Sequence, residues 1–228
     1  RPERPIPAGE ISAASAAALG CALSAAGLGL AALHGKVPFL VSVLLLAVVL
    51  AYDALLKGGW AGPLAMGVCR ALNVFLGLSV DLTGRAWLTP SWLVLGVFTL
   101  LITELSRFEV GGTQPARLRN TLFGFSALAL VAAVSASLFA WRNGAPPVSW
   151  IVASCAFGFV LWRERQLLAP IWHKASGPLL GRAIGGGILL MPAIDATFVA
   201  AAGAPLAAAV TAAFMAPAWL LKRWYYLT

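Results

Sequence analysis

The residues of this sequence best suited to chemistry are polar side chains within or beside long apolar segments. Asp53 and Lys57 are four residues apart near the end of one such segment, so they can pair on one helix face. Arg70 and Asn73 are three residues apart near the middle of the next segment, so they face the same way. A charge at membrane depth is costly without a partner or a water-filled cavity. Arg70 therefore predicts either a buried ion pair or a cavity for an anion, whereas Asp53 with Lys57 also fits a plain interfacial ion pair.

Three further carboxylates belong to the same set of candidates. Glu104 and Glu109 lie five residues apart where an apolar segment meets a loop. This spacing does not stack them on one helical face, but fraying of the helix would let both reach one hard cation through oxygen ligands. A plain loop role is the equal alternative. Asp195 lies well inside a later apolar segment, where pairing with Arg70 is favoured over a proton or substrate relay, and Asp53 and Glu104 are the other possible partners of Arg70.

The elements that must position these residues are long apolar segments. Of the 228 residues, 61% are hydrophobic and 11% are charged, which excludes a soluble domain. The apolar segments are long enough to cross a bilayer as helices, and they cover approximately 11–34, 38–56, 61–80, 91–106, 118–141, 148–162, 179–202 and 205–221. The sequence thus predicts an all-α, polytopic transmembrane bundle of about eight spans, in one domain over 1–228. Because 148–162 is short and the last two segments nearly touch, seven spans is the alternative.

Basic residues orient this bundle. One side collects Arg1, Arg4, Lys57, Arg107, Arg117, Arg119, Arg163, Arg165, Lys174, Arg182, Lys222 and Arg223. The other side has Lys36, Arg85 and Arg142. Cytoplasmic loops carry the excess of lysine and arginine, so we expect both ends of the chain in the cytoplasm. The net charge of +8 forms no basic stripe on an amphipathic face, which argues against nucleic-acid binding.

Glycines cluster within two of the predicted spans. Gly27 and Gly29 lie in the first span, and Gly181 with 185–187 lies near the start of the seventh. Small residues of this kind let helix backbones approach one another. No Lys-Ser or Lys-Thr follows the second cluster, so it is not a phosphate-binding Walker loop. We expect these glycines to pack helices.

Three segments resemble the UbiA prenyltransferase superfamily. The run from Arg1 to Ser12 resembles its Arg-Pro-Leu/Ile-Pro-Ser-Gly-Arg-Ile-Ser segment, and the run from Tyr52 to Lys57 is similar to its Tyr-x-x-x-x-Lys. Glu104 stands, together with a second glutamate five residues on, where the family carries paired aspartates, a departure from its second aspartate-rich motif. The runs 52–73 and 105–109 are most similar to a bacterial, EboC-like branch. In the family the first segment follows an N-D-x-x-D-x-x-x-D motif, so we expect the natural protein to begin earlier, with two more helices and that motif.

The resemblance implies an integral membrane enzyme of the bacterial inner membrane. It would transfer a prenyl group from an isoprenoid diphosphate to a small-molecule or lipid acceptor, within membrane lipid. Mg²⁺ would bridge carboxylates and diphosphate and so stabilise the leaving group. Without the first aspartate motif, the chain by itself is expected to be inactive.

The resemblance also implies roles for the polar residues that lie toward the cytoplasmic side. These are Lys57, Arg70, Tyr52 and Asn73 as catalytic residues, Lys57, Arg70 and Asp53 as substrate-binding residues, and Glu104 and Glu109 as metal ligands. The rival interpretation is a membrane transport or export component, in which Arg70, Asp195 and Glu104 line a translocation path. A third interpretation is a non-catalytic subunit, which predicts that the protein tolerates Arg70→Ala and Lys57→Ala.

Overall fold

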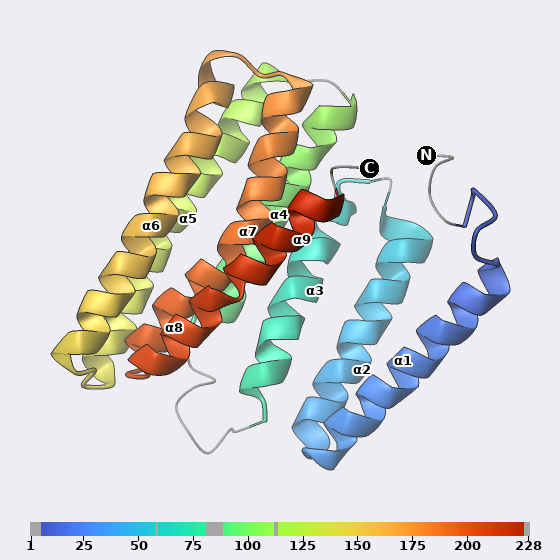
Figure 1. Ribbon diagram of the computed structural model, residues 1–228, viewed down its shortest axis with the longest axis horizontal. Helices are drawn as coiled ribbons and strands as arrows, with labels where there is room; N and C mark the ends of the chain where they lie inside the picture. Colours follow the sequence, from blue (N-terminus) through green and yellow to red (C-terminus); the bar gives the residue numbers. More distant parts are fainter. Residues whose placement is uncertain (1–5, 58, 81–88, 112–113, 226–228) are drawn as a thin grey trace.

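Helices make up nearly all of the chain in the computed structural model, which describes residues 6–57, 59–80, 89–111 and 114–225. Within these ranges no strand occurs, as the sequence predicts. The helices are α1 (Ala13–Leu33), α2 (Lys36–Ala51), the π-helical turn η1 (Tyr52–Leu56), α3 (Ala61–Leu78), α4 (Ser91–Gly111), α5 (Pro115–Arg142), α6 (Pro147–His173), α7 (Gly177–Ala201), α8 (Pro205–Ala213) and α9 (Met215–Tyr225). Figure 1 shows them running up and down beside one another as an antiparallel bundle.

Local sequence explains several helix starts. The Ser12 hydroxyl accepts a hydrogen bond from the backbone N–H of Ser15 and so caps α1. Helices α5, α6, α7 and α8 each carry a proline in the first turn. Proline is tolerated there because that turn's N–H groups have no partner within the helix. The boundaries that result lie within a few residues of most of the predicted apolar segments.

Six helices of the described chain are long and apolar enough to cross a membrane, namely α1, α2 with η1, α3, α4, α5 and α7. The other two predicted spans are also helical, but they differ from the prediction. Helix α6 continues to His173 instead of ending near residue 162, so Arg163, Glu164 and Arg165 lie within a helix and not in a loop. The segment 205–221 is divided into α8 and α9 near Phe214.

The antiparallel arrangement places several candidate residues at one end of the bundle, at the top of Figure 1, namely Tyr52, Asp53, Lys57, Glu104 and Glu109, whereas Arg70, Asn73 and Asp195 lie deeper. We call this end of the bundle the motif end, and it holds η1, the last turns of α4 and the first turns of α5. Lys36 and Arg142 lie at the opposite end. The basic residues at these helix ends therefore segregate as the sequence predicts, whereas Arg163 and Arg165 lie inside α6. Arg1, Arg4 and Arg85, which also belong to the prediction, lie outside the described residues, as do the side chains of residues 222 and 223.

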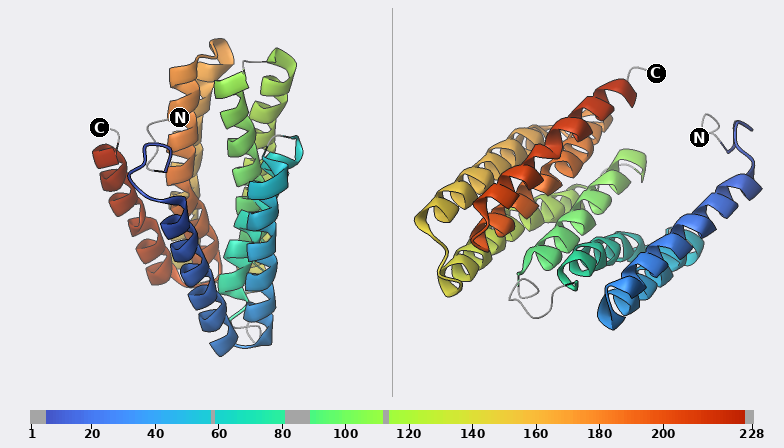
Figure 2. Two further views of the ribbon diagram at one scale, coloured as in Figure 1. Left: turned by 90° about the vertical axis from the view of Figure 1, so that its right-hand side faces the viewer. Right: turned by 60° about the horizontal axis from the view of Figure 1, so that its bottom comes forward.

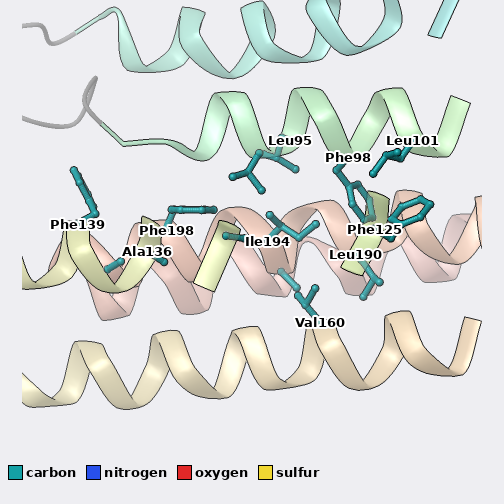
Figure 3. Packing of buried hydrophobic residues seen from close by; sticks show 14 of the residues in the cluster. Leu95, Phe98, Leu101, Phe125, Ala136, Phe139, Val160, Leu190, Ile194 and Phe198 are labelled. Carbon is teal, nitrogen blue, oxygen red and sulfur yellow. The ribbon is translucent and has the colours of Figure 1, made fainter. Parts of the chain in front are cut away.

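The hydrophobic core lies among α4, α5, α6 and α7. Leu95, Phe125, Leu190 and Phe198 are almost completely buried, and Figure 3 shows them pointing into the space shared by these helices. Phe98 meets Phe125 nearly edge to face, with ring centroids 5.6 Å apart. Edge-to-face contact is a favoured geometry for aromatic rings. These helices thus form the well-packed half of the bundle.

Helix α1, by contrast, lies at the edge of the bundle and packs only on α2 within the described chain (Figure 2). Ala31 is its one buried residue, and Leu19, Leu23 and Leu30 are more than 60% exposed. In a bilayer such side chains meet lipid, which is as apolar as leucine.

Close packing by glycine occurs at α3 and α4. A Cβ added to Gly67 would lie 2.7 Å from the carbonyl oxygen of Gly96, so the two backbones nearly touch. Gly187 packs as predicted, since a Cβ there would collide with Ile102. The prediction for Gly27 and Gly29 is wrong within the described chain, because a Cβ at either position would meet no atom within 4 Å. Glycine content alone does not reveal which face of a helix has a neighbour.

We predict that Gly67→Ala destabilises the bundle by about 1–3 kcal/mol, the usual cost of overpacking a close contact. The added methyl group would force α3 away from the Gly96 carbonyl. Thermal unfolding in detergent measures the effect, and Gly27→Ala is the matched control, because its Cβ enters open space. An equal melting temperature for the two variants would contradict the close contact.

Candidate functional site

Tyr52 and Lys57 meet because of the π turn at the end of α2. An α-helix closes its hydrogen bonds over four residues, whereas a π turn closes them over five, so residues five apart come to lie one turn apart. The Nζ atom of Lys57 lies 5.8 Å from the centre of the Tyr52 ring. It also lies 2.5 Å from Oδ1 of Asp53, which confirms the predicted pair.

This ion pair lies on the surface of the bundle, near the end of its helix. The side chains of Lys57 and Asp53 are 60% and 57% exposed. An exposed pair contributes at most about 1 kcal/mol to stability. Lys57 can therefore leave Asp53 for a stronger anion at little cost, while the Tyr52 ring limits the space that its ammonium group explores.

Arg70 forms a second polar centre, deeper in the bundle. It lies about 14 Å along α3 from the motif end, at 1.5 Å per residue. Its Nη1 donates a long hydrogen bond of 3.5 Å to Oδ1 of Asn73, so the two side chains share a face as predicted. Its Nη2 lies 4.0 Å from Oδ2 of Asp195 on α7, and both side chains are about 70% buried. Of the three acids considered as partners of Arg70, the structure pairs it with Asp195.

The Arg70 guanidinium keeps donor capacity beyond these contacts. Its Nε is buried and has no hydrogen-bond partner among the described residues. Buried hydrogen-bond donors in native proteins nearly always have a partner, so an unsatisfied donor needs an explanation. A bound anion or a water beside α3 would provide it.

The carboxylates of α4 are arranged differently from the expectation. The helix continues without fraying through Gly111, so residues five apart point about 140° away from each other. Oε1 of Glu104 lies 2.5 Å from Nε of Arg117 on α5, and Oε2 lies 3.6 Å from Nη1 of Arg107. Glu109 is exposed and reaches toward α7, where a Cβ on Gly181 would lie 2.9 Å from its Oε1.

These carboxylates do not by themselves fit a magnesium site. Both oxygens of Glu104 face guanidinium groups, and Glu109 leaves the same helix in another direction. Among the described residues, no group of three or more acidic, histidine or cysteine side chains is placed to hold a metal ion. A hard cation needs several oxygen ligands that converge on one point.

Glu164 is a candidate that sequence reasoning missed. It is half-buried on α6 and borders a groove of about 560 Å³ between α5 and α6, together with Ser126, Leu168 and Trp172. It has no ion pair within the part of the chain that the structure describes. The signal in the sequence is the charged run 163–165, but the apolar segment ends before it, and hydrophobicity therefore predicts a loop there.

Taken together, α2 to α5 present cationic side chains at two depths of the bundle. Lys57 and Arg117 lie near the motif end, and Arg70 lies deeper. Arginine and lysine bind phosphate groups through charge-assisted hydrogen bonds, and arginine does so in a bidentate manner. The arrangement is suited to binding an anionic group at the motif end of an apolar bundle.

The chain is similar to a known protein over about half of its length. Digeranylgeranylglyceryl phosphate synthase of Metallosphaera sedula is 35% identical to the chain over 118 residues. The matched part is 51% of this chain and 40% of the relative, so the chain spans two fifths of that protein's length. No protein-family model matches the chain, and no solved structure matches it significantly. The similarity supports the resemblance to the UbiA superfamily.

Proposed function

We propose that this chain is a UbiA-type integral membrane prenyltransferase, nearest to the EboC-like branch. It moves a prenyl group from an isoprenoid diphosphate to a small-molecule or lipid acceptor. The helical membrane bundle and the relative named as a synthase support the proposal. The observation that carries it is the contact of Lys57 with Tyr52 and Asp53 at the motif end, above the deeper Arg70 pair with Asp195.

In this proposal the cationic residues bind the leaving group. The C–O bond between the prenyl chain and the diphosphate breaks, and its electron pair leaves with the diphosphate. Lys57 and Arg70 stabilise the charge that develops on the diphosphate oxygens. The acceptor then forms a bond to the allylic carbon and gives up its proton. Apolar walls keep water from the allylic cation that forms when the C–O bond breaks. Asn73 holds the Arg70 guanidinium in place.

Asp53 and Tyr52 position the lysine in this scheme. Asp53 holds Lys57 at the motif end until substrate arrives, and Tyr52 supplies an aromatic face beside it. We place the motif end in the cytoplasm, on the strength of the basic residues gathered there.

Magnesium is expected from the resemblance alone. Because Glu104 and Glu109 do not converge, no step of the proposal is assigned to a metal ion held by them. The expectation that the chain alone does not catalyse transfer stays a prediction, and binding is therefore the first readout.

Lys57→Ala should weaken the binding of geranylgeranyl diphosphate about tenfold or more, because one charge-assisted hydrogen bond to phosphate is lost. The measurement is fluorescence or calorimetric titration of the chain in phosphatidylcholine nanodiscs. Lys36→Ala, at the opposite end of the bundle, is the matched control and should bind as the unaltered chain does. Equal affinity of the two variants would remove Lys57 from the site. Passage of the diphosphate across a vesicle membrane would instead favour the transport alternative.

A further inference from the structure

An arginine pair lies between the end of α4 and the start of α5, where the resemblance predicts a metal. Arg107 and Arg117 both face Glu104, so two guanidinium groups share one carboxylate. Glu104 is 13% exposed, whereas the two arginine side chains are 35% and 43% exposed. The carboxylate is thus enclosed between two cations that remain reachable from outside.

The cluster of Arg107, Arg117 and Glu104 has a net positive charge and unused hydrogen-bond donors. One carboxylate neutralises one of two guanidinium groups, and each guanidinium has five N–H donors. Nη1 of Arg107 is buried and makes no hydrogen bond among the described residues, because its 3.6 Å separation from Glu104 is too long for one. Glu109 is the other acid nearby, but it reaches toward Gly181 on α7 and forms no ion pair with either arginine.

Guanidinium groups suit a diphosphate. They are planar, permanently charged and able to donate two parallel hydrogen bonds to phosphate oxygens. Arg107 and Arg117 come from two consecutive helices, α4 and α5, and meet at the motif end. An anion between them would receive donors from both helices.

We infer that Arg107, at the end of α4, and Arg117, at the start of α5, bind the diphosphate directly, without a metal ion, and that Glu104 occupies their guanidinium donors when no diphosphate is bound. The inference rests on the proposed function for the identity of the substrate. The pair supplies positive charge at the place where carboxylate-bound Mg²⁺ is expected from the resemblance.

The two roles of Glu104 predict opposite effects of the same substitution. A metal ligand that is neutralised loses the metal, and the diphosphate then binds more weakly. A carboxylate that competes with the diphosphate for guanidinium donors has the reverse effect, because its neutralisation frees those donors and adds a net positive charge. Glu104→Gln therefore separates the metal site from the arginine site by the sign of the change.

The experiment titrates inorganic pyrophosphate into the full chain in phosphatidylcholine nanodiscs, in EDTA and in Mg²⁺. We expect the unaltered chain to bind in EDTA, Glu104→Gln to bind several-fold more tightly, and Arg117→Gln to bind about tenfold more weakly. Arg119→Gln is the matched control, since Arg119 is exposed on the same helix and forms no ion pair within the described chain. Binding that requires Mg²⁺ and is lost in Glu104→Gln would overturn the inference. If Glu104→Gln fails to fold, the comparison of Arg117→Gln with Arg119→Gln in EDTA still tests the site, because Lys57 and Arg70 are unchanged in both variants.

Geranylgeranyl diphosphate, titrated in parallel, distinguishes this inference from the proposed function. If it binds only with Mg²⁺ and Glu104→Gln abolishes binding, the inference fails and the proposed function stands. If pyrophosphate follows the expected pattern but the prenyl chain adds no affinity, the arginine site stands and the prenyltransferase proposal fails.

Discussion

Arg70→Gln is expected to destabilise the bundle by about 2–3 kcal/mol, because it leaves the Asp195 carboxylate without its cation inside the helix bundle. Asp195→Asn should cost a similar amount, since it leaves the guanidinium unpaired. The double variant Arg70→Gln with Asp195→Asn should regain most of the loss, because two amides can bond to each other and no charge remains. Thermal unfolding of the four proteins in one detergent measures this cycle.

The same four proteins also test whether Arg70 does more than pair. If its guanidinium binds the diphosphate, the double variant recovers stability but not affinity for geranylgeranyl diphosphate. Recovery of both would make the pair purely structural. Asp53→Asn is the control for stability, since its pair with Lys57 is exposed and should contribute less than about 1 kcal/mol.

Inserting one alanine after Leu55 is expected to reduce diphosphate binding about tenfold or more, whereas deleting Leu55 is expected to preserve it. The π turn keeps Tyr52 and Lys57 on one face although they are five residues apart. Deletion leaves Tyr52 and the lysine four residues apart, and residues four apart share a face of an ordinary α-helix. Insertion leaves them six apart, which neither kind of turn brings together.

Leu55 is a suitable place for both changes because its side chain is 81% exposed and packs on nothing in the core. Leu55→Ala is the substitution control and should bind normally. Titration with geranylgeranyl diphosphate in nanodiscs measures all three variants. Loss of binding on deletion, with binding kept on insertion, would show that the π turn does not set the register of Lys57.

The sequence by itself determined the fold class and the local pairs. Long apolar segments can satisfy their backbone groups in a membrane as helices, so the all-α bundle follows from composition and segment length. Asp53 with Lys57, and Arg70 with Asn73, were predictable because residues three or four apart share a helix face wherever the helix lies. The division of basic residues between two ends followed from the antiparallel order of the helices.

Helix ends were predicted less well, for a physical reason. Hydrophobicity marks the part of a helix inside lipid, but hydrogen bonding and packing continue α4 to Gly111 and α6 to His173 beyond that part. The prediction of a frayed carboxylate pair at Glu104 is wrong because α4 stays helical through Gly111. The position of Glu164 beside α5 was not predicted because α6 continues beyond its apolar segment.

Only the tertiary structure decided which distant residues meet. Arg70 had three possible acids, and the packing of α3, α4 and α7 brought it to Asp195. Glu104 met Arg117 because α5 returns antiparallel to α4 at the motif end. Periodicity fixes the direction of a side chain about its own helix axis, but the identity of the neighbour depends on how the helices are placed in space.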